Sequence, residues 1–312
     1  MRPKILVIRG GAIGDFVLTL PAIKLLRENF PSAHLEILGY RHILALAEGR
    51  FYADAIRSIE YAALAGFFIP GSELAPELVE YFSGFHQVIS YLFDPDGFFE
   101  ANLRRCGVKN FLSISPILNQ LAHASHQLAW PLEQLALYLE APQAQLFPSE
   151  ADRQFAAEFL RADSRPIIAV HPSSGSPKKN WPVQLWGGLS QWLLLQKPEP
   201  LILLIGGEAD QEPVAALQQF IPKGSLRLAH DLPLPHLAAL LECASLFLGH
   251  DSGVSHIAAA VQTRCILMFG PTNPDVWAPL GEHVTLLRSS EEDISKIPVE
   301  EIQREVLAKG LW

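Results

Sequence analysis

Several polar and glycine-rich clusters follow predicted strands, and their residue types suit the binding of phosphate groups. The strongest is residues 249–256 (GHDSGVSH), where Asp251 or Ser252 can cap the helix that begins there. The backbone N–H groups of Ser252, Gly253 and Val254 would then point at a ligand from the positive end of the helix dipole. Such N–H groups bind anions, and a glycine lets phosphate approach the backbone closely. Capping alone explains Asp251 and Ser252 equally well.

A second loop, residues 171–182 (HPSSGSPKKNWP), combines hydroxyl groups, backbone amides and lysines between a strand and a helix. Hydroxyls and amides suit phosphate oxygens, and a lysine supplies the neutralising charge. The loop lacks the GxxxxGK[ST] spacing of a P-loop, which argues against an ATPase. By itself, an exposed basic turn is the simpler interpretation.

Two carboxylates follow glycines at the ends of predicted strands. Glu208 comes directly after Gly206 and Gly207, and a carboxylate at this place in nucleotide-binding folds commonly accepts hydrogen bonds from ribose hydroxyls. Asp15 ends the turn at residues 10–15 (GGAIGD), where a carboxylate suits a general base. An acid favoured by the helix dipole explains either residue equally well. The glycine spacing does not match GxGxxG, so an NAD enzyme ranks low.

The composition excludes several classes of protein. The 312 residues are 49% hydrophobic and 18% charged, which is enough apolar material for two domain cores. A net charge of −9 argues against nucleic-acid binding, which requires a basic face. Cys106, Cys243 and Cys265 form no CxxC pair and are typical of reduced thiols. A signal peptide and an apolar run of about 20 residues are both missing, so a soluble, cytoplasmic chain is expected.

Strand and helix patterns alternate along both halves of the chain. The predicted strands are residues 4–9, 34–39, 87–92, 167–171, 201–205, 246–249 and 265–269. The first predicted helix follows residue 15 and includes Val17, Leu20, Ile23 and Leu26. The other predicted helices cover residues 98–106, 121–139, 150–161, 182–195, 234–243, 252–261 and 298–308. This alternation predicts an α/β fold with two doubly wound, Rossmann-like domains, whose central cleft lies at the carboxyl ends of the strands.

The Pro-rich segment 141–150 is the expected connection between the domains. We therefore expect an N-terminal domain at residues 1–145 and a C-terminal domain at residues 146–295. Residues 296–312 are expected to form a C-terminal helix that packs back toward the N-terminal domain.

The order of five motifs resembles glycosyltransferase family 9, whose best-known members are the ADP-heptose:lipopolysaccharide heptosyltransferases. The motifs are GGAIGDFVLTLPAI, HPSSGSPKKNWP, LLIGGEADQE, GHDSGVSHIAAA and FGPTNPDVWAPLG. They occur in both halves of the chain, while residues 40–130 are weakly matched. The resemblance implies a GT-B fold and an inverting, metal-independent transfer of a sugar from a nucleotide-sugar donor, by family default ADP-heptose.

Site residues follow from the resemblance. It implies Asp15 as the general base, with Arg9, Gly11 and Gly14 on the acceptor side. The donor-binding residues that it implies are Ser173, Ser174, Lys179, Glu208, Leu232, Asp251, Ser252, Gly253, Val254 and His256. Serines stand at 173, 174 and 252, where the family often has threonine, and the lysine loop is one residue longer. Serine and threonine both carry a hydroxyl group, so each of the three positions keeps one.

No metal site and no resident cofactor are expected. The histidines show no HExxH or paired spacing. Asp94, Pro95 and Asp96 form a DxD triplet, which binds a metal in another glycosyltransferase architecture, but turn chemistry explains it better here.

The implied partners are the nucleotide-sugar donor and a glycolipid or glycan acceptor of the cell envelope. A lipid acceptor would bring the cytoplasmic protein into peripheral contact with the inner membrane surface. Two alternatives stay open: a nucleotide-sugar-binding protein without catalysis, and a nucleotide-sugar epimerase of similar fold that needs no acceptor.

Overall fold

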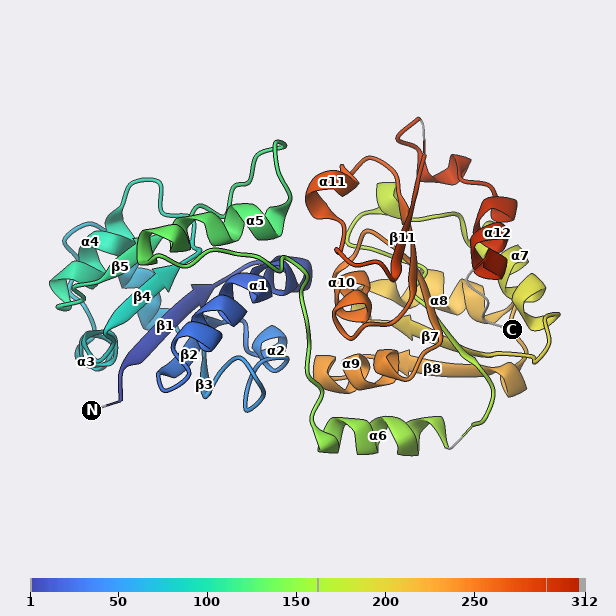
Figure 1. Ribbon diagram of the computed structural model, residues 1–312, viewed down its shortest axis with the longest axis horizontal. Coiled ribbons are helices and arrows are strands. Elements are labelled where there is room, and N and C mark those ends of the chain that lie inside the picture. Colours follow the sequence, from blue (N-terminus) through green and yellow to red (C-terminus); the bar gives the residue numbers. More distant parts are fainter. Residues whose placement is uncertain (1, 162, 290, 309–312) are drawn as a thin grey trace. The chain divides into compact units, whose positions relative to one another are not determined.

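The computed structural model describes residues 2–161, 163–289 and 291–308, and the chain divides into two compact units, Met1–Pro142 and Gln143–Trp312 (Figure 1). The division falls three residues before the predicted boundary at 145/146. Residues 309–312 of the predicted C-terminal helix lie outside the described residues. Within the described residues, no helix has both the length and the apolar composition that a bilayer span requires.

The N-terminal unit is built on a parallel sheet of order β3-β2-β1-β4-β5. Its strands are β1 (Lys4–Arg9), β2 (His34–Gly39), β3 (Ala55–Ser58), β4 (Gln87–Ser90) and β5 (Phe111–Ser113). Its α-helices are α1 (Ile13–Asn29), α2 (Arg41–Leu44), α3 (Pro76–Ser83), α4 (Phe98–Arg105) and α5 (Ala124–Ala129). The core of this unit includes an aromatic cluster, in which the ring centroids of Phe67 and of Phe82 in α3 are 5.0 Å apart.

The C-terminal unit is built on a parallel sheet of order β11-β10-β9-β6-β7-β8. Its strands are β6 (Ile167–Val170), β7 (Leu201–Gly206), β8 (Leu226–His230), β9 (Leu246–His250), β10 (Cys265–Phe269) and β11 (Val284–Arg288). Its α-helices are α6 (Glu150–Leu160), α7 (Val183–Leu194), α8 (Gln211–Gln218), α9 (Leu234–Glu242), α10 (Gly253–Ala260), α11 (Pro274–Trp277) and α12 (Val299–Ala308).

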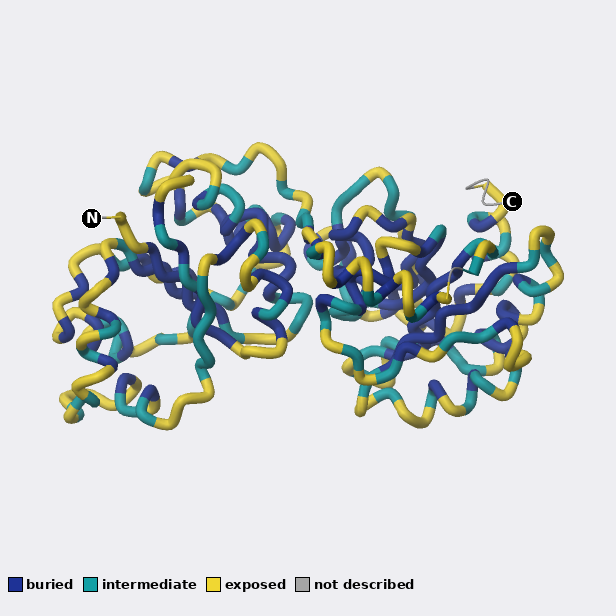
Figure 2. Tube along the Cα trace, turned by 90° about the horizontal axis from the view of Figure 1, so that it is seen from below, coloured by how far each residue is buried: buried dark blue, intermediate teal, exposed yellow. Residues whose placement is uncertain are grey.

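Each sheet reverses its strand order once, between β1 and β4 and between β6 and β9. Doubly wound sheets bind ligands at such a switch point, outside the carboxyl ends of the strands. The central strands β6, β7, β9 and β10 are buried along their whole length, as expected for strands covered on both faces (Figure 2). The predicted α/β class with two doubly wound domains is therefore confirmed.

The structure differs from one predicted helix in length and shows how a second one packs. The helix predicted for residues 121–139 is wrong in length, because only α5 is an α-helix there and a 3-10 helix at Trp130–Leu135 follows. Pro131 lacks the N–H that would continue the α-helical bonding. At the C-terminus, Ile302 and Val306 of α12 are buried in the core of the C-terminal unit. The packing of this helix toward the N-terminal domain stays a prediction.

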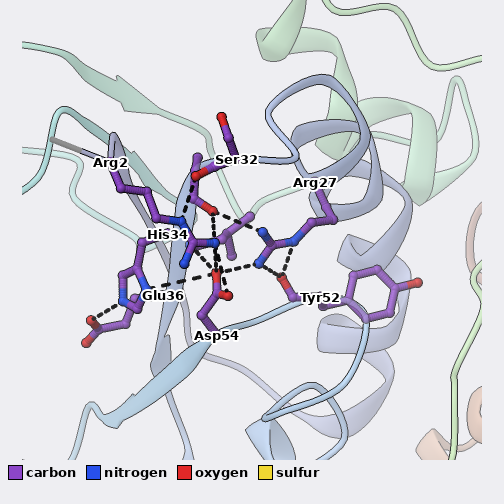
Figure 3. A network of polar contacts seen from close by, with 9 residues as sticks. Arg2, Arg27, Ser32, His34, Glu36, Tyr52 and Asp54 are labelled. Carbon is purple, nitrogen blue, oxygen red and sulfur yellow. Dashed lines mark hydrogen bonds and ion pairs between the residues drawn. The ribbon is translucent and has the colours of Figure 1, made fainter.

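A cluster of charged side chains ties together the amino ends of β1, β2 and β3, at the edge opposite the carboxyl ends of these strands (Figure 3). Asp54 accepts hydrogen bonds from Arg27 Nη2 at 2.8 Å, from the Leu35 amide at 2.9 Å and from Arg2 Nη2 at 3.2 Å. Arg27 Nη2 also donates to the Tyr52 carbonyl at 3.0 Å. Burial alone would raise the pKa of Asp54, but the bonds from Arg27 and Leu35 outweigh it and lower the pKa to about 2.

Replacing Asp54 with asparagine should lower the free energy of unfolding at neutral pH by only about 1 kcal/mol, because solvent screens the charge of this partly exposed carboxylate. Because its folded pKa lies below the unfolded value, the contribution is present above about pH 4 and is lost as the pH falls toward 2. Urea unfolding at several pH values should show the difference between wild type and variant shrinking on acidification. The exposed Asp96→Asn is the control; a pH-independent difference for Asp54→Asn would contradict this account.

Candidate functional site

In the N-terminal unit, Asp15 lies at the start of α1, where β1 ends. Its Oδ2 accepts the N–H of Ala12, the N-cap residue of α1, at 2.8 Å. Gly11 has φ +93°, and a Cβ there would lie 2.7 Å from Asp15 Oδ2. Glycine is therefore required at this position by both backbone conformation and space. The alternative considered from the sequence was an acid favoured by the helix dipole, and in the structure this carboxylate also caps the helix.

Arg9 lies behind Asp15 and is almost fully buried. Its Nε donates to Thr19 Oγ1 at 2.9 Å, and its Nη2 lies 3.5 Å from Asp15 Oδ1. Burial lowers the pKa of Arg9, and the charge of Asp15 opposes that effect. The Asp15 side chain is 37% exposed, so its carboxylate is supported from inside by Arg9 and can still meet a ligand from solvent. This arrangement can accept a proton from a bound hydroxyl group.

In the C-terminal unit, α10 begins directly after β9 with Ser252 as its N-cap. Ser252 Oγ accepts the N–H of Ser255 at 3.4 Å. Gly253 and Val254 belong to the first turn, whose N–H groups have no partner within a helix. The helix start predicted from the sequence is therefore confirmed, and its dipole favours an anion at this end.

Lys179 and Asp251 meet at the switch point of the C-terminal sheet. Lys179 ends a 3-10 turn, Pro177–Lys179, in the loop after β6, and Asp251 follows the neighbouring strand β9. Lys179 Nζ donates to Asp251 Oδ2 at 2.6 Å, and the two side chains are 32% and 11% exposed. The lysine is therefore held beside the N-terminus of α10. An anion bound there would compete with Asp251 for the ammonium group.

A buried polar network links the two loops, and sequence reasoning missed two of its members, His171 and Asp210. Asp210 accepts hydrogen bonds from Ser173 Oγ and from the Gly207 amide, the latter at 2.8 Å. The imidazole of His171 lies between Asp210 Oδ2, 3.4 Å from Nε2, and Ser252 Oγ, 3.3 Å from Nδ1. Burial alone would raise the pKa of Asp210, but these partners lower it to about 2.

Replacing Asp210 with asparagine should lower the free energy of unfolding by about 1 to 2 kcal/mol at neutral pH, because Ser173 and His171 lose an ionised acceptor. The folded pKa again lies below the unfolded one, so this contribution is present above about pH 4 and disappears toward pH 2. Chemical unfolding, with the exposed Asp275→Asn as control, measures it. Equal stability of wild type and Asp210→Asn at pH 7 would refute the role of this network.

The loop after β6 is anchored at its far end by His250, the last residue of β9. His250 Nε2 accepts the Trp181 amide at 3.0 Å, and Trp181 Nε1 donates to the Ile297 carbonyl at 3.0 Å. Full burial, with a smaller effect of His171, lowers the pKa of His250 to about 3, so this imidazole is neutral. Within the loop, Ser174 Oγ donates to Asn180 Oδ1 at 2.7 Å. The loop is thus fixed at both ends.

A cavity of about 580 Å³ lies between this loop and α8. Its lining includes Ser173, Ser174 and Asn180 on one side and Glu212, Pro213 and Ala216 on the other. Its volume is within the range of small-molecule sites.

The remaining predicted donor residues lie outside the network. Glu208 is exposed in the 3-10 turn Glu208–Asp210, Leu232 is partly buried after β8, and His256 is buried in α10. Their roles stay predictions. Asp94 accepts the amides of Phe99 and Glu100 at 3.1 and 3.0 Å, so the DxD triplet supplies a helix cap. Among the described residues, no group of three or more His, Cys, Asp or Glu could hold a metal ion.

Comparisons with known proteins identify the family to which the sequence is similar. The sequence model of glycosyltransferase family 9 (heptosyltransferase) matches residues 117–305, more than half of the chain. Lipooligosaccharide heptosyltransferase 2 of Haemophilus influenzae is 30% identical over 166 residues. That alignment covers 51% of this chain and 46% of the relative, so the match spans about half the length of the curated protein.

Two solved structures show the same fold over nearly the whole chain. A glycosyl transferase family 9 protein from Veillonella parvula has a TM-score of 0.82 at 18% identity, covering 98% of this chain and 97% of that one. The ADP-heptose lps heptosyltransferase II of E. coli has a TM-score of 0.78 at 18% identity, covering 98% of each chain. At this identity the likeness establishes the fold, which is the GT-B fold.

Proposed function

The chain belongs to glycosyltransferase family 9, and from this premise we propose that it transfers a heptose from ADP-heptose to a hydroxyl group of a lipopolysaccharide-core acceptor. The observation that carries the proposal is the position of Lys179 beside the N-terminus of α10, at the switch point of the C-terminal sheet. A cation and a helix N-terminus at one place form a site for a diphosphate. We place the reaction in the cytoplasm, at the inner face of the membrane that holds a lipid-linked acceptor.

The proposed donor site uses the two loops that the buried network joins. The amides of Gly253 and Val254 bind the diphosphate together with Lys179, and the hydroxyl groups of Ser173, Ser174 and Ser252 turn from their partners in the free chain to donate to it. Glu208 binds the ribose and Leu232 packs against the base, while Asp251 and His256 lie next to the sugar. Asp210 and His171 act as positioning residues, because they contact Ser173 and Ser252 in the free chain.

The proposed donor site must stabilise ADP as the leaving group. As the bond between the anomeric carbon and the phosphate oxygen breaks, negative charge develops on ADP. Preorganised donors and a lysine stabilise that charge at the moment of reaction, and such electrostatic stabilisation is usually the largest catalytic contribution. In this proposal Lys179 and the first turn of α10 take the place of a divalent cation.

The proposed acceptor chemistry uses Asp15. The acceptor hydroxyl forms a bond to the anomeric carbon from the face opposite ADP, and its proton passes to the Asp15 carboxylate. The configuration at the anomeric carbon is therefore inverted. Arg9 supports the carboxylate from the protein interior, and Gly11 leaves room for it. Gly14, in the first turn of α1, completes this acceptor-side segment.

Calorimetric titration in the presence of EDTA tests the proposed donor site. ADP and ADP-heptose should bind the wild-type chain with the same affinity with and without a chelator, and more tightly than UDP or GDP. A strict requirement for Mg²⁺, or equal affinity for all three nucleotides, would show that the donor site has been assigned wrongly.

A further inference from the structure

Thr19 is a fully buried polar residue in α1, one helical turn after Asp15. The residues on either side of it, Leu18 and Leu20, are buried and apolar. A valine at this position would differ only in having a methyl group where threonine has its hydroxyl. Because a buried hydroxyl is costly unless it is hydrogen-bonded, the partners of Thr19 indicate what the hydroxyl is for.

The Thr19 hydroxyl makes two hydrogen bonds, and the chemistry of the partners fixes the direction of each. Arg9 Nε can only donate, so Thr19 Oγ1 accepts from it at 2.9 Å. The hydroxyl proton is then donated to the carbonyl of Asp15 at 2.7 Å. Arg9 Nη2 donates to the same carbonyl at 3.2 Å. One hydroxyl group therefore ties the end of β1 to the first turn of α1.

The ring of Tyr91 supplies a further contact to Arg9. The Cζ atom of Arg9 lies 5.8 Å from the ring centroid, which is within the range of a cation–π interaction. Tyr91 is buried, and its hydroxyl donates to the carbonyl of Leu128 in α5 at 3.2 Å. Its amide donates to the carbonyl of Ile8 in β1 at 2.9 Å. The ring is thus held in place from both sides of the sequence that carries Arg9.

Stability alone is a poor explanation for the burial of Arg9. Its side chain is 4% exposed, and burial lowers its pKa, while the charge of Asp15 and a smaller effect of Tyr91 oppose that change. Replacing a buried ion pair with apolar side chains is often neutral or stabilising. The acidic partner of Arg9 is Asp15, whose side chain is 37% exposed. A buried cation next to a carboxylate that solvent reaches indicates a role in binding or chemistry.

The Asp15 carboxylate is oriented at both of its oxygens. Oδ2 accepts the Ala12 amide at 2.8 Å, and Oδ1 lies 3.5 Å from Arg9 Nη2. An arginine side chain has many rotamers, so its guanidinium group fixes a neighbour only if it is fixed itself. The contacts from Thr19 and Tyr91 restrict Arg9 in this way.

We propose that Thr19 and Tyr91 are positioning residues for the transfer step, which hold Arg9 and, through it, the Asp15 carboxylate in the orientation that receives the proton of the acceptor hydroxyl. When that proton arrives, the Asp15 carboxyl group becomes neutral. Arg9 then keeps its bond to Thr19 and its contact with the Tyr91 ring, so the buried charge retains partners throughout the step. The inference rests on the proposed function, because it takes Asp15 as the general base.

The variants Thr19→Val and Thr19→Ser test the role of the hydroxyl. Thr19→Val should lower the turnover number about tenfold without changing ADP affinity, because the carboxylate is no longer held in its reactive orientation. Thr19→Ser keeps the hydroxyl and should turn over as wild type does. The matched control is Thr263→Val, since Thr263 is also buried and its Oγ1 donates to the Leu241 carbonyl at 2.6 Å. Equal losses of turnover in Thr19→Val and Thr263→Val, or no loss in Thr19→Val, would overturn the proposal.

A double-mutant cycle separates positioning from a general effect on folding. If Thr19 acts through Asp15, adding Thr19→Val to Asp15→Asn should lower the residual turnover no further. Losses that multiply would show that Thr19 acts independently of Asp15 and would contradict the proposal. Tyr91→Phe keeps the ring and should turn over as wild type does, whereas Tyr91→Leu should lose turnover as Thr19→Val does. A fully active Tyr91→Leu variant would refute the role of the ring.

Hydrogen exchange at the Arg9 side chain tests the inference without relying on transferase activity. In protein labelled with ¹⁵N-arginine, the Nε–H signal of Arg9, identified by its absence in Arg9→Lys, should exchange slowly with water. Thr19→Val should accelerate this exchange about tenfold or more, and Thr19→Ser should not. That result in a chain without transferase activity would support the holding of Arg9 and refute only the proposed function. Unchanged exchange in Thr19→Val would overturn the inference even in an active transferase.

Discussion

Replacing Asp15 with asparagine should lower the turnover number of the proposed heptose transfer by about 100-fold or more while the affinity for ADP stays unchanged. Asparagine keeps an oxygen that can accept the Ala12 amide, so the cap of α1 survives. What the variant loses is the charge beside Arg9 and the ability to take a proton from the acceptor. Steady-state kinetics with saturating donor, together with ADP titration, measure the two effects separately.

The chain supplies a matched control for this variant. Asp152 occupies the same position in α6 as Asp15 does in α1, and its Oδ2 accepts the N-cap amide of Ser149 at 2.7 Å. Asp152→Asn therefore reproduces the loss of a capping carboxylate without touching the proposed acceptor site. It should change the stability of the protein and leave turnover as in wild type. If both variants lose turnover equally, Asp15 is a helix cap and the general base must be sought elsewhere.

Replacing Lys179 with methionine should weaken ADP binding by about ten- to a hundredfold, because the proposed charge-assisted contact to the diphosphate is lost while the aliphatic stem is kept. The loss should shrink as salt is added, since the ammonium group is about one-third exposed and its charge is screened. Calorimetry at two ionic strengths measures both effects.

Lys178, the preceding residue, provides the comparison. It is exposed on the same 3-10 turn, so Lys178→Met removes the same charge from the same loop. It should change ADP affinity by less than about twofold, because solvent and salt screen the exposed charge of Lys178, which makes no contact in the proposed donor site. Equal losses in the two variants would mean that the net charge of the loop, and not the contact of Lys179 at α10, determines the affinity.

The central architecture could be predicted from the sequence because its signals are local. β1, β2, β7 and β9 are apolar runs that end in glycine or a polar turn, and the structure forms them within one residue of the predicted bounds. The strands that sequence reasoning missed are the edge strands of the two sheets: β3, β5, β8 and β11. Edge strands are only partly covered, so their residues show no continuous apolar run.

The candidate site was predicted less completely, because its contacts join residues that are far apart in the sequence. The helix start at Ser252 carries a local capping signal. The bond between Ser173 and Asp210 spans 37 residues and has no such signal. Glu208 and Asp210 are two carboxylates in one turn, and only the folded turn shows that Asp210 faces the serine loop while Glu208 is exposed.

The charged cluster around Asp54 escaped sequence reasoning for the same reason. Arg2 and Asp54 lie 52 residues apart, and neither belongs to a recognisable motif. Such clusters stabilise the sheet that carries a site without taking part in its chemistry.

The most direct test of the proposed transferase is to follow ADP release and the mass of the acceptor together, with ADP-heptose and a core saccharide in EDTA. The account predicts one ADP released for each acceptor that gains one heptose, no reaction without acceptor, and almost none with Asp15→Asn. Donor left intact in the presence of acceptor, or a changed sugar nucleotide formed without acceptor, would contradict it.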